Sequence, residues 1–88
     1  MCTYRTEHVQ LRGSAKAGPD GWRGIGPTTV YFDHPVHAPA EHTLNIDFAD
    51  PAGDPSARIA VELTAASAQE LVSAIRRALS GVPPDLLR

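Results

Sequence analysis

The segment from Phe32 to His42, FDHPVHAPAEH, concentrates side chains that could bind a metal or transfer a proton. It holds His34, His37 and His42, together with one aspartate and one glutamate. A neutral imidazole donates a lone pair to zinc or iron, and its pKa near neutrality also suits acid–base work. The segment is therefore a metal site, a catalytic site or a polar turn between two strands.

The elements that would position these histidines follow from the residue pattern. Four segments are rich in β-branched and aromatic residues or alternate between apolar and polar residues, which predicts strands over 3–11, 28–34, 43–49 and 57–64. Glycines and prolines predict a long loop over 13–27 and a tight turn over 50–56. Short connections favour antiparallel pairing of the second, third and fourth strands.

A helix is predicted from Ser67 to Leu79. Ser67 and Glu70 fit a capping box, and the apolar residues that follow recur at helical spacing. A glycine and two prolines then end the helix, so 82–88 is expected to be a flexible tail. The sequence thus predicts one α+β domain over 1–88, in which a four-stranded antiparallel sheet (β-β-β-β-α) carries one C-terminal helix packed on one face.

Matching parity in three strands and the helix predicts a single core. The residues expected to be buried together are Val30, Phe32, Leu44, Ile46, Phe48, Ile59, Val61, Leu63, Leu71, Val72, Ile75 and Leu79. Since an 88-residue chain has a thin core and one helix covers only one face of a sheet, we expect a homodimer.

The same parity brings part of the histidine segment together. His34 and His42 share the core side at the end of a hairpin, so we expect them to lie side by side, with His37 in the loop between them. Glu7 shares the parity of Val9 in the first strand. The candidate metal ligands are therefore His34, His42, Glu7 and His37, a set that suits zinc or iron. The spacing matches no established zinc motif, so strand-end histidines that bond to loop backbone remain the alternative.

The opposite face of the sheet is polar. It carries Tyr31, Asp33, Asn45, Asp47 and Glu62, with Arg58 beside them. Asp33 and Asp47 could act as paired carboxylates, although a solvated surface or a wet dimer interface accounts for the same pattern. Trp22 either anchors the glycine-rich loop or forms a wall of a ligand pocket. Trp22, Tyr31 and Asp33 are the candidate ligand-binding residues.

Composition narrows the classes of partner. The net charge is −2 and the basic residues do not cluster beyond Arg76 and Arg77, which argues against a nucleic-acid partner. No apolar run is long enough for a membrane span, and the N-terminus does not resemble a signal peptide. Cys2 is the single cysteine, which excludes a disulfide within the chain and fits a reducing compartment. Removal of Met1 would expose Cys2 as a nucleophile or metal ligand; a small filler in the first strand is the alternative.

Three stretches resemble a family of small uncharacterised actinobacterial proteins, a domain of unknown function. They are MCTYRTE at the start, the pair Gly21-Trp22, and VYFDHPVHAPAEHTLNIDF. The resemblance extends over roughly Met1 to Leu79 and implies a bacterial cytoplasmic protein. It carries no activity with it, so the histidine segment has to be interpreted from its own chemistry.

Three functions are open at this point. The first is a small metal-binding protein, in which His34 and His42 with Glu7 or His37 hold zinc or iron and act on a small metabolite under a cover formed by Trp22 and its loop. The second is a non-catalytic homodimeric binding or assembly module. The third is a metal-free enzyme that uses a histidine as its base.

Overall fold

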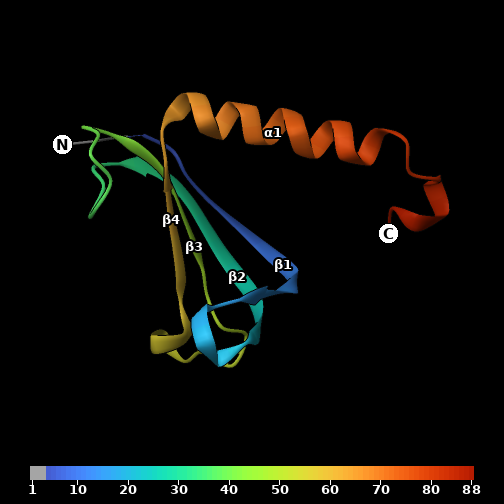
Figure 1. Cartoon of the computed structure of the whole chain (residues 1–88), viewed down its shortest axis with the longest axis horizontal. Helices are drawn as coiled ribbons and strands as arrows, with labels where there is room; N and C mark the ends of the chain where they lie inside the picture. Colours follow the sequence, from blue (N-terminus) through green and yellow to red (C-terminus); the bar gives the residue numbers. More distant parts are fainter. Residues whose placement is uncertain (1–3) are drawn as a thin grey trace.

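Four antiparallel strands followed by one helix make up the computed structural model, which describes residues 4–88 apart from the side chain of residue 20 (Figure 1). The elements are β1 (Thr6–Lys16), η1 (Gly18–Asp20), β2 (Trp22–Asp33), β3 (Thr43–Phe48), η2 (Pro55–Ala57), β4 (Ile59–Leu63), α1 (Ala65–Ser80) and η3 (Pro84–Leu86), where η marks a short 3-10 helix. The strands lie in the order β1-β2-β3-β4, so each pairs with its neighbour in sequence. The predicted α+β fold is confirmed.

The prediction of a loop over 13–27 is wrong, because most of these residues belong to strands. β1 continues to Lys16 and β2 begins at Trp22, and these two residues face each other at the far end of a long hairpin. The register shifts at a bulge between Gln10 and Gly13. Glycine carries no side chain, so the glycines in this stretch hide the period-two alternation that marks a strand.

Two glycines make the turn of this hairpin possible. Gly18 and Gly21 have φ angles of 59° and 84°, a region that side chains disfavour. The Ala17 N–H donates to the Gly21 carbonyl at 2.9 Å and closes the turn. Glycines that were expected to make a loop irregular thus serve to reverse an extended ribbon.

The helix begins two residues earlier than expected, and its cap is different. Thr64 is extended, with φ −62° and ψ 155°, and its hydroxyl accepts the Ser67 N–H at 3.1 Å. The predicted capping role of Ser67 and Glu70 is therefore wrong: Ser67 is the donor to the cap rather than the cap itself. A single residue, Thr64, connects β4 to α1. Within the described residues, no helix has the length and apolar character that a membrane crossing requires.

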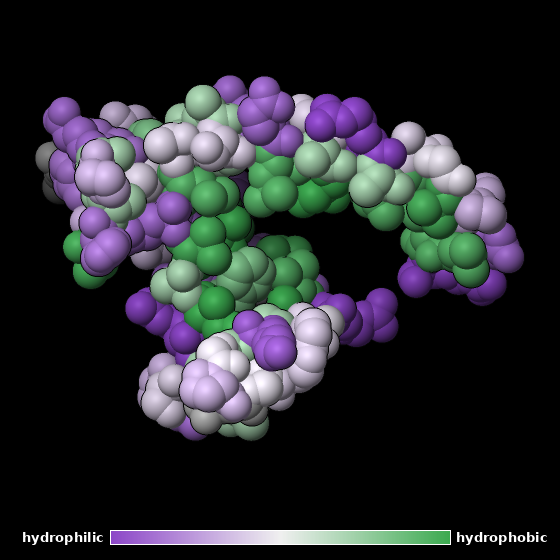
Figure 2. Space-filling view, in the orientation of Figure 1, coloured by the Kyte–Doolittle hydropathy of each residue, from purple (hydrophilic) through white to green (hydrophobic). Residues whose placement is uncertain are grey.

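The expected common core is not formed by this chain alone. None of the described hydrophobic side chains is buried, and the helix stripe Leu71, Val72, Ile75 and Leu79 is 44–51% exposed. The reason lies in the direction of α1, which approaches β3 and β4 near its start and then runs away from the sheet (Figure 1). Figure 2 shows the consequence, an open space between helix and sheet with apolar residues on both sides.

Candidate functional site

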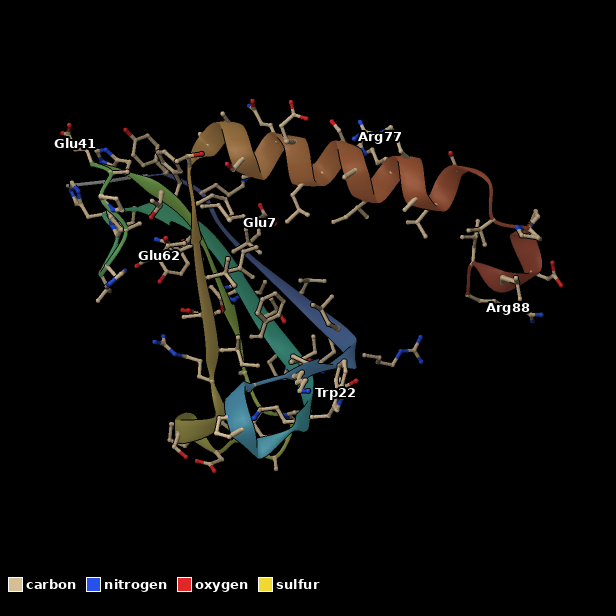
Figure 3. The ribbon with its side chains drawn as sticks, viewed as in Figure 1. Glu7, Trp22, Glu41, Glu62, Arg77 and Arg88 are labelled. Atoms are coloured by element: carbon tan, nitrogen blue, oxygen red, sulfur yellow. The ribbon has the colours of Figure 1, made fainter. Side chains whose placement is uncertain are left out.

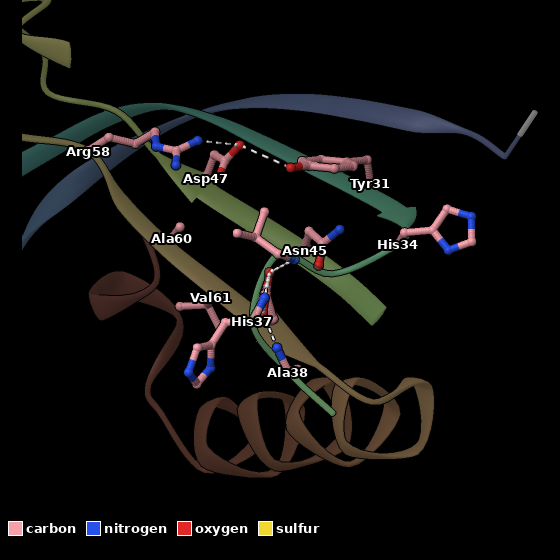
Figure 4. A pocket seen from close by; sticks show the side chains of 11 residues that line it. Tyr31, His34, His37, Ala38, Asn45, Asp47, Arg58, Ala60 and Val61 are labelled. Atoms are coloured by element: carbon pink, nitrogen blue, oxygen red, sulfur yellow. Dashed lines mark hydrogen bonds and ion pairs between the residues drawn. The ribbon is translucent and has the colours of Figure 1, made fainter. Parts of the chain in front are cut away.

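A cavity of about 470 Å³ lies on the polar face of the sheet, where the connection after β2 folds over the strands (Figure 4). Its floor includes Tyr31, Asn45 and Asp47 from β2 and β3, and its rim includes Arg58 and the segment 36–38. The polar side chains that the sequence pattern assigns to a solvated face thus surround a hollow. Volumes of this size are typical of sites for small molecules.

Several residues that line this cavity have side chains that can donate hydrogen bonds. Asn45 is the least exposed of them. Its side chain is 3% exposed, and that of its neighbour Thr43 is fully buried. The Thr43 hydroxyl donates to the Asn45 amide oxygen at 2.6 Å. The Asn45 amide nitrogen makes no hydrogen bond to any residue that the structure describes. Because this nitrogen carries two N–H groups, Asn45 offers donors to whatever occupies the cavity.

Tyr31, Asp47 and Arg58 form a chain of polar contacts along one side of the cavity. The Tyr31 hydroxyl donates to Asp47 Oδ2 at 3.3 Å, and Arg58 Nη1 lies 3.3 Å from the same oxygen. Burial, and then the negative charge of Asp47, raises the pKa of Tyr31. Tyr31 therefore stays protonated at neutral pH and acts as a donor. The Asp47 carboxylate is thus already paired with Arg58 and Tyr31. The Arg58 side chain is about half exposed, so its other nitrogens are accessible.

Glu62 fixes the segment that covers the cavity. Its carboxylate accepts the backbone N–H groups of Val36, His37 and Ala38, the last at 2.8 Å. These hydrogen bonds, from Val36 first and then Ala38, lower the pKa of Glu62. The side chain is thus ionised at neutral pH, and its charge is taken up by main-chain donors rather than offered to a ligand.

His34 and His42 lie side by side, as their strand parity predicts. Their ring centroids are 4.4 Å apart, and the His42 ring stacks on Phe32 at 5.7 Å with Tyr4 edge-on at 6.2 Å. His34 Nδ1 lies 3.0 Å from the carbonyl oxygen of Glu41. Since a carbonyl only accepts, Nδ1 carries the proton, and Nε2 is the nitrogen with the lone pair in the neutral ring.

The other two expected metal ligands do not join this pair. Glu7 Oε2 lies 3.1 Å from Arg5 Nε on the outermost strand β1. The backbone N–H of His37 donates a hydrogen bond to the Glu62 carboxylate. Among residues 4–88 as described, no three His, Cys, Asp or Glu side chains come close enough to hold a metal. The expected set of four is therefore not assembled there.

The expected ligand-binding residues separate in the same way. Tyr31 lines the cavity, whereas Trp22 is 69% exposed at the opposite end of the sheet from Glu41 and Glu62 (Figure 3). Trp22 thus neither anchors a loop in a core nor forms a wall of this cavity. Asp33 accepts the His34 N–H at 2.7 Å and does not line the cavity.

Asp33 and Asp47 do not form a carboxylate pair. Asp47 faces Thr29, which precedes Asp33 by four residues in β2, so the backbone positions of the two aspartates are about 13 Å apart along the strand. Asn45 and Arg58 emerge instead as site residues. The sequence pattern assigns them to a solvated face, and no local signal shows that the segment 36–38 folds over them.

Comparison with known proteins gives one match. The model of a family of unknown function (DUF6295) matches residues 1–88. No curated protein and no solved structure matches.

Proposed function

We propose that this chain, which belongs to the DUF6295 family of unknown function, binds a small molecule that presents carbonyl or carboxylate oxygens to the cavity beside Asn45. The observation that carries the proposal is the Asn45 side chain. It is 3% exposed, and its amide nitrogen has no hydrogen-bond partner within residues 4–88 as described. None of the described side-chain nitrogens or oxygens is both fully buried and without a partner, so the Asn45 nitrogen is accessible at the cavity, where a ligand oxygen would accept a hydrogen bond from it.

The charges around the cavity favour the same class of ligand. Asp47 interacts with Arg58 and Tyr31, and Glu62 accepts hydrogen bonds from backbone N–H groups. The negative charge of both carboxylates is therefore already compensated, which does not favour a cationic ligand. The donors that remain are the Asn45 amide and the outer nitrogens of Arg58. A molecule with one planar oxygen-bearing group and an apolar body would meet these donors and the aliphatic wall formed by Ala60.

The test uses the side-chain amide signals in a ¹H–¹⁵N spectrum of the full chain. Asn45 is the single asparagine, and the two glutamines, Gln10 and Gln69, supply internal controls. Benzoate and benzamide are the probes, because they match in size and differ in charge. We expect both to shift the Asn45 signals saturably, and benzoate to bind more tightly because Arg58 is positive.

A pair of charge-removing variants sharpens this test. Arg58→Gln should weaken benzoate binding about tenfold and affect benzamide less, whereas Arg76→Gln on the helix should leave both unchanged. The proposal fails if neither probe moves the Asn45 signals at millimolar concentration. It also fails if the Gln69 signals shift as much as those of Asn45.

Metal binding is a second candidate function, favoured by the 4.4 Å separation of the His34 and His42 rings. Two imidazoles leave at least one position to be filled from outside the described set, since structural zinc takes four ligands and catalytic zinc three. Cys2 stands two residues before Tyr4 in the sequence and lies outside the described residues. A thiolate binds zinc and would bring the number of protein ligands to three.

Calorimetric titration with zinc tests this candidate. We expect His34→Ala to abolish binding, because half of the imidazole pair is lost, while His8→Ala leaves it intact, since His8 lies on β1 beside Thr29. Cys2→Ser distinguishes a site that uses the thiol from one that does not. If the unmodified chain takes up neither zinc nor iron, or if the two histidine variants behave alike, the pair is a structural stack.

A further inference from the structure

We propose that a second copy of this chain covers the apolar face beneath α1, so that the helix of each copy packs on the sheet of the other. The helix presents Leu71, Val72, Ile75 and Leu79 on one stripe, each about half exposed. The sheet presents its own apolar face across the open space, and Val9 on β1 is 46% exposed there. Figure 2 shows both surfaces lining the same hollow.

The size of the exposed surface indicates how much a partner must cover. A compact monomer of 9.4 kDa would expose about 5,000 Å², whereas this chain exposes 6795 Å². Its radius of gyration is 14.6 Å, against about 12 Å for a compact domain of this length. If two copies each buried the excess of about 1,800 Å², the interface would total about 3,600 Å², which is in the range of obligate homodimers.

The connection to the helix argues that the cover comes from another molecule. α1 follows β4 after the single residue Thr64, whose side chain caps the helix by accepting the Ser67 N–H at 3.1 Å. With this connection, α1 approaches β3 and β4 near its start and then runs away from the sheet. The stripe therefore faces the open space over its own sheet without packing on it, and that space is left for another molecule to fill.

A second copy fits this face better than a different partner because both complementary parts belong to the same chain. Each copy carries one apolar helix stripe and one apolar sheet face, and a two-fold axis would satisfy both pairs at once. The outer surface of the helix is polar in Figure 2, which matches a dimer with solvent outside.

Sedimentation equilibrium of the full chain tests the proposal. We expect a mass twice the 9.4 kDa of the chain at micromolar concentration. Ile75→Glu should raise the dissociation constant about 30-fold or more, as for a central interface residue. Ser73→Glu is the matched control, because it adds the same charge on the opposite side of α1 and should leave the dimer intact.

A second substitution separates the arrangement from a simpler helix pair. Val9→Glu on the sheet should weaken the dimer as Ile75→Glu does, since the helix of the partner would rest on that face. Circular dichroism reports whether each variant keeps its helix and sheet. The proposal is overturned by a monomer mass at high micromolar concentration, by equal effects of Ile75→Glu and Ser73→Glu, or by a folded Val9→Glu chain that dimerises as tightly as the original.

Discussion

Replacement of Thr43 by valine is expected to lower the free energy of unfolding by about 1–3 kcal/mol, although valine has nearly the same shape. Thr43 is fully buried, and its hydroxyl is the donor to the Asn45 amide oxygen at 2.6 Å. The substitution leaves that buried oxygen without its donor while it adds no cavity. Urea unfolding of the two chains, followed by circular dichroism, measures the difference.

Thr29→Val is the control for this experiment. The Thr29 hydroxyl makes an exposed contact of 3.4 Å with His8 Nδ1, so its loss should change the free energy of unfolding by less than about 0.5 kcal/mol. The Asn45 amide signals should also move in Thr43→Val and stay in place in Thr29→Val. Equal unfolding midpoints for the two variants would show that the Thr43–Asn45 hydrogen bond does not support the floor of the cavity.

Glu62→Gln is expected to free the segment that covers the cavity. The carboxylate accepts three backbone N–H groups, whereas a glutamine has one uncharged acceptor oxygen. Amide hydrogen exchange at Val36, His37 and Ala38 should therefore accelerate by about tenfold or more, with little change in the sheet. Glu41→Gln in the same connection is the control, and exchange as fast in that variant would contradict the anchoring role of Glu62.

The hydrogen bonds of Glu62 also make the stability of the segment 36–38 depend on pH. Hydrogen bonds hold the pKa of Glu62 below its ordinary value of 4.5, so the ionised form stabilises the fold. This contribution is complete above pH 4.5 and is lost as the pH falls through the lowered pKa, where the carboxylate takes up a proton. Protection of the amides at 36–38, measured relative to the intrinsic exchange rate at each pH, should fall in that acidic range in the original chain and stay constant in Glu62→Gln.

Strand parity was enough to predict the central part of the sheet. Val30 faces Ile46 and Phe32 faces Leu44, as the alternation in the two segments requires. The neighbouring position of His34 and His42 follows from the same rule, because both residues continue these strands past their ends. The alternation of side chains along two paired strands is enough to predict which residues share a face of the sheet, whatever the rest of the fold.

The remaining parts depend on contacts that no local pattern contains. Glu62 accepts hydrogen bonds from Val36 and Ala38 across more than twenty residues of sequence, and this contact holds the segment that lines the cavity together with the strands. The cap at Thr64 competes with an equally good signal at Ser67 and Glu70, and the extended backbone of Thr64 decides between them. The exposed helix stripe was predicted as core because periodicity identifies an apolar face but not the molecule that covers it.

The bulge between Gln10 and Gly13 has a consequence for aggregation. β1 and β4 are the edges of the sheet, and an unpaired edge can template further strands from other molecules. The bulge interrupts the regular backbone of β1, where Arg12 and Lys16 add charge, and β4 offers only the five residues Ile59–Leu63. Growth into an open-ended ribbon is thus disfavoured at both edges, and the face beneath the helix is left as the route to a closed assembly.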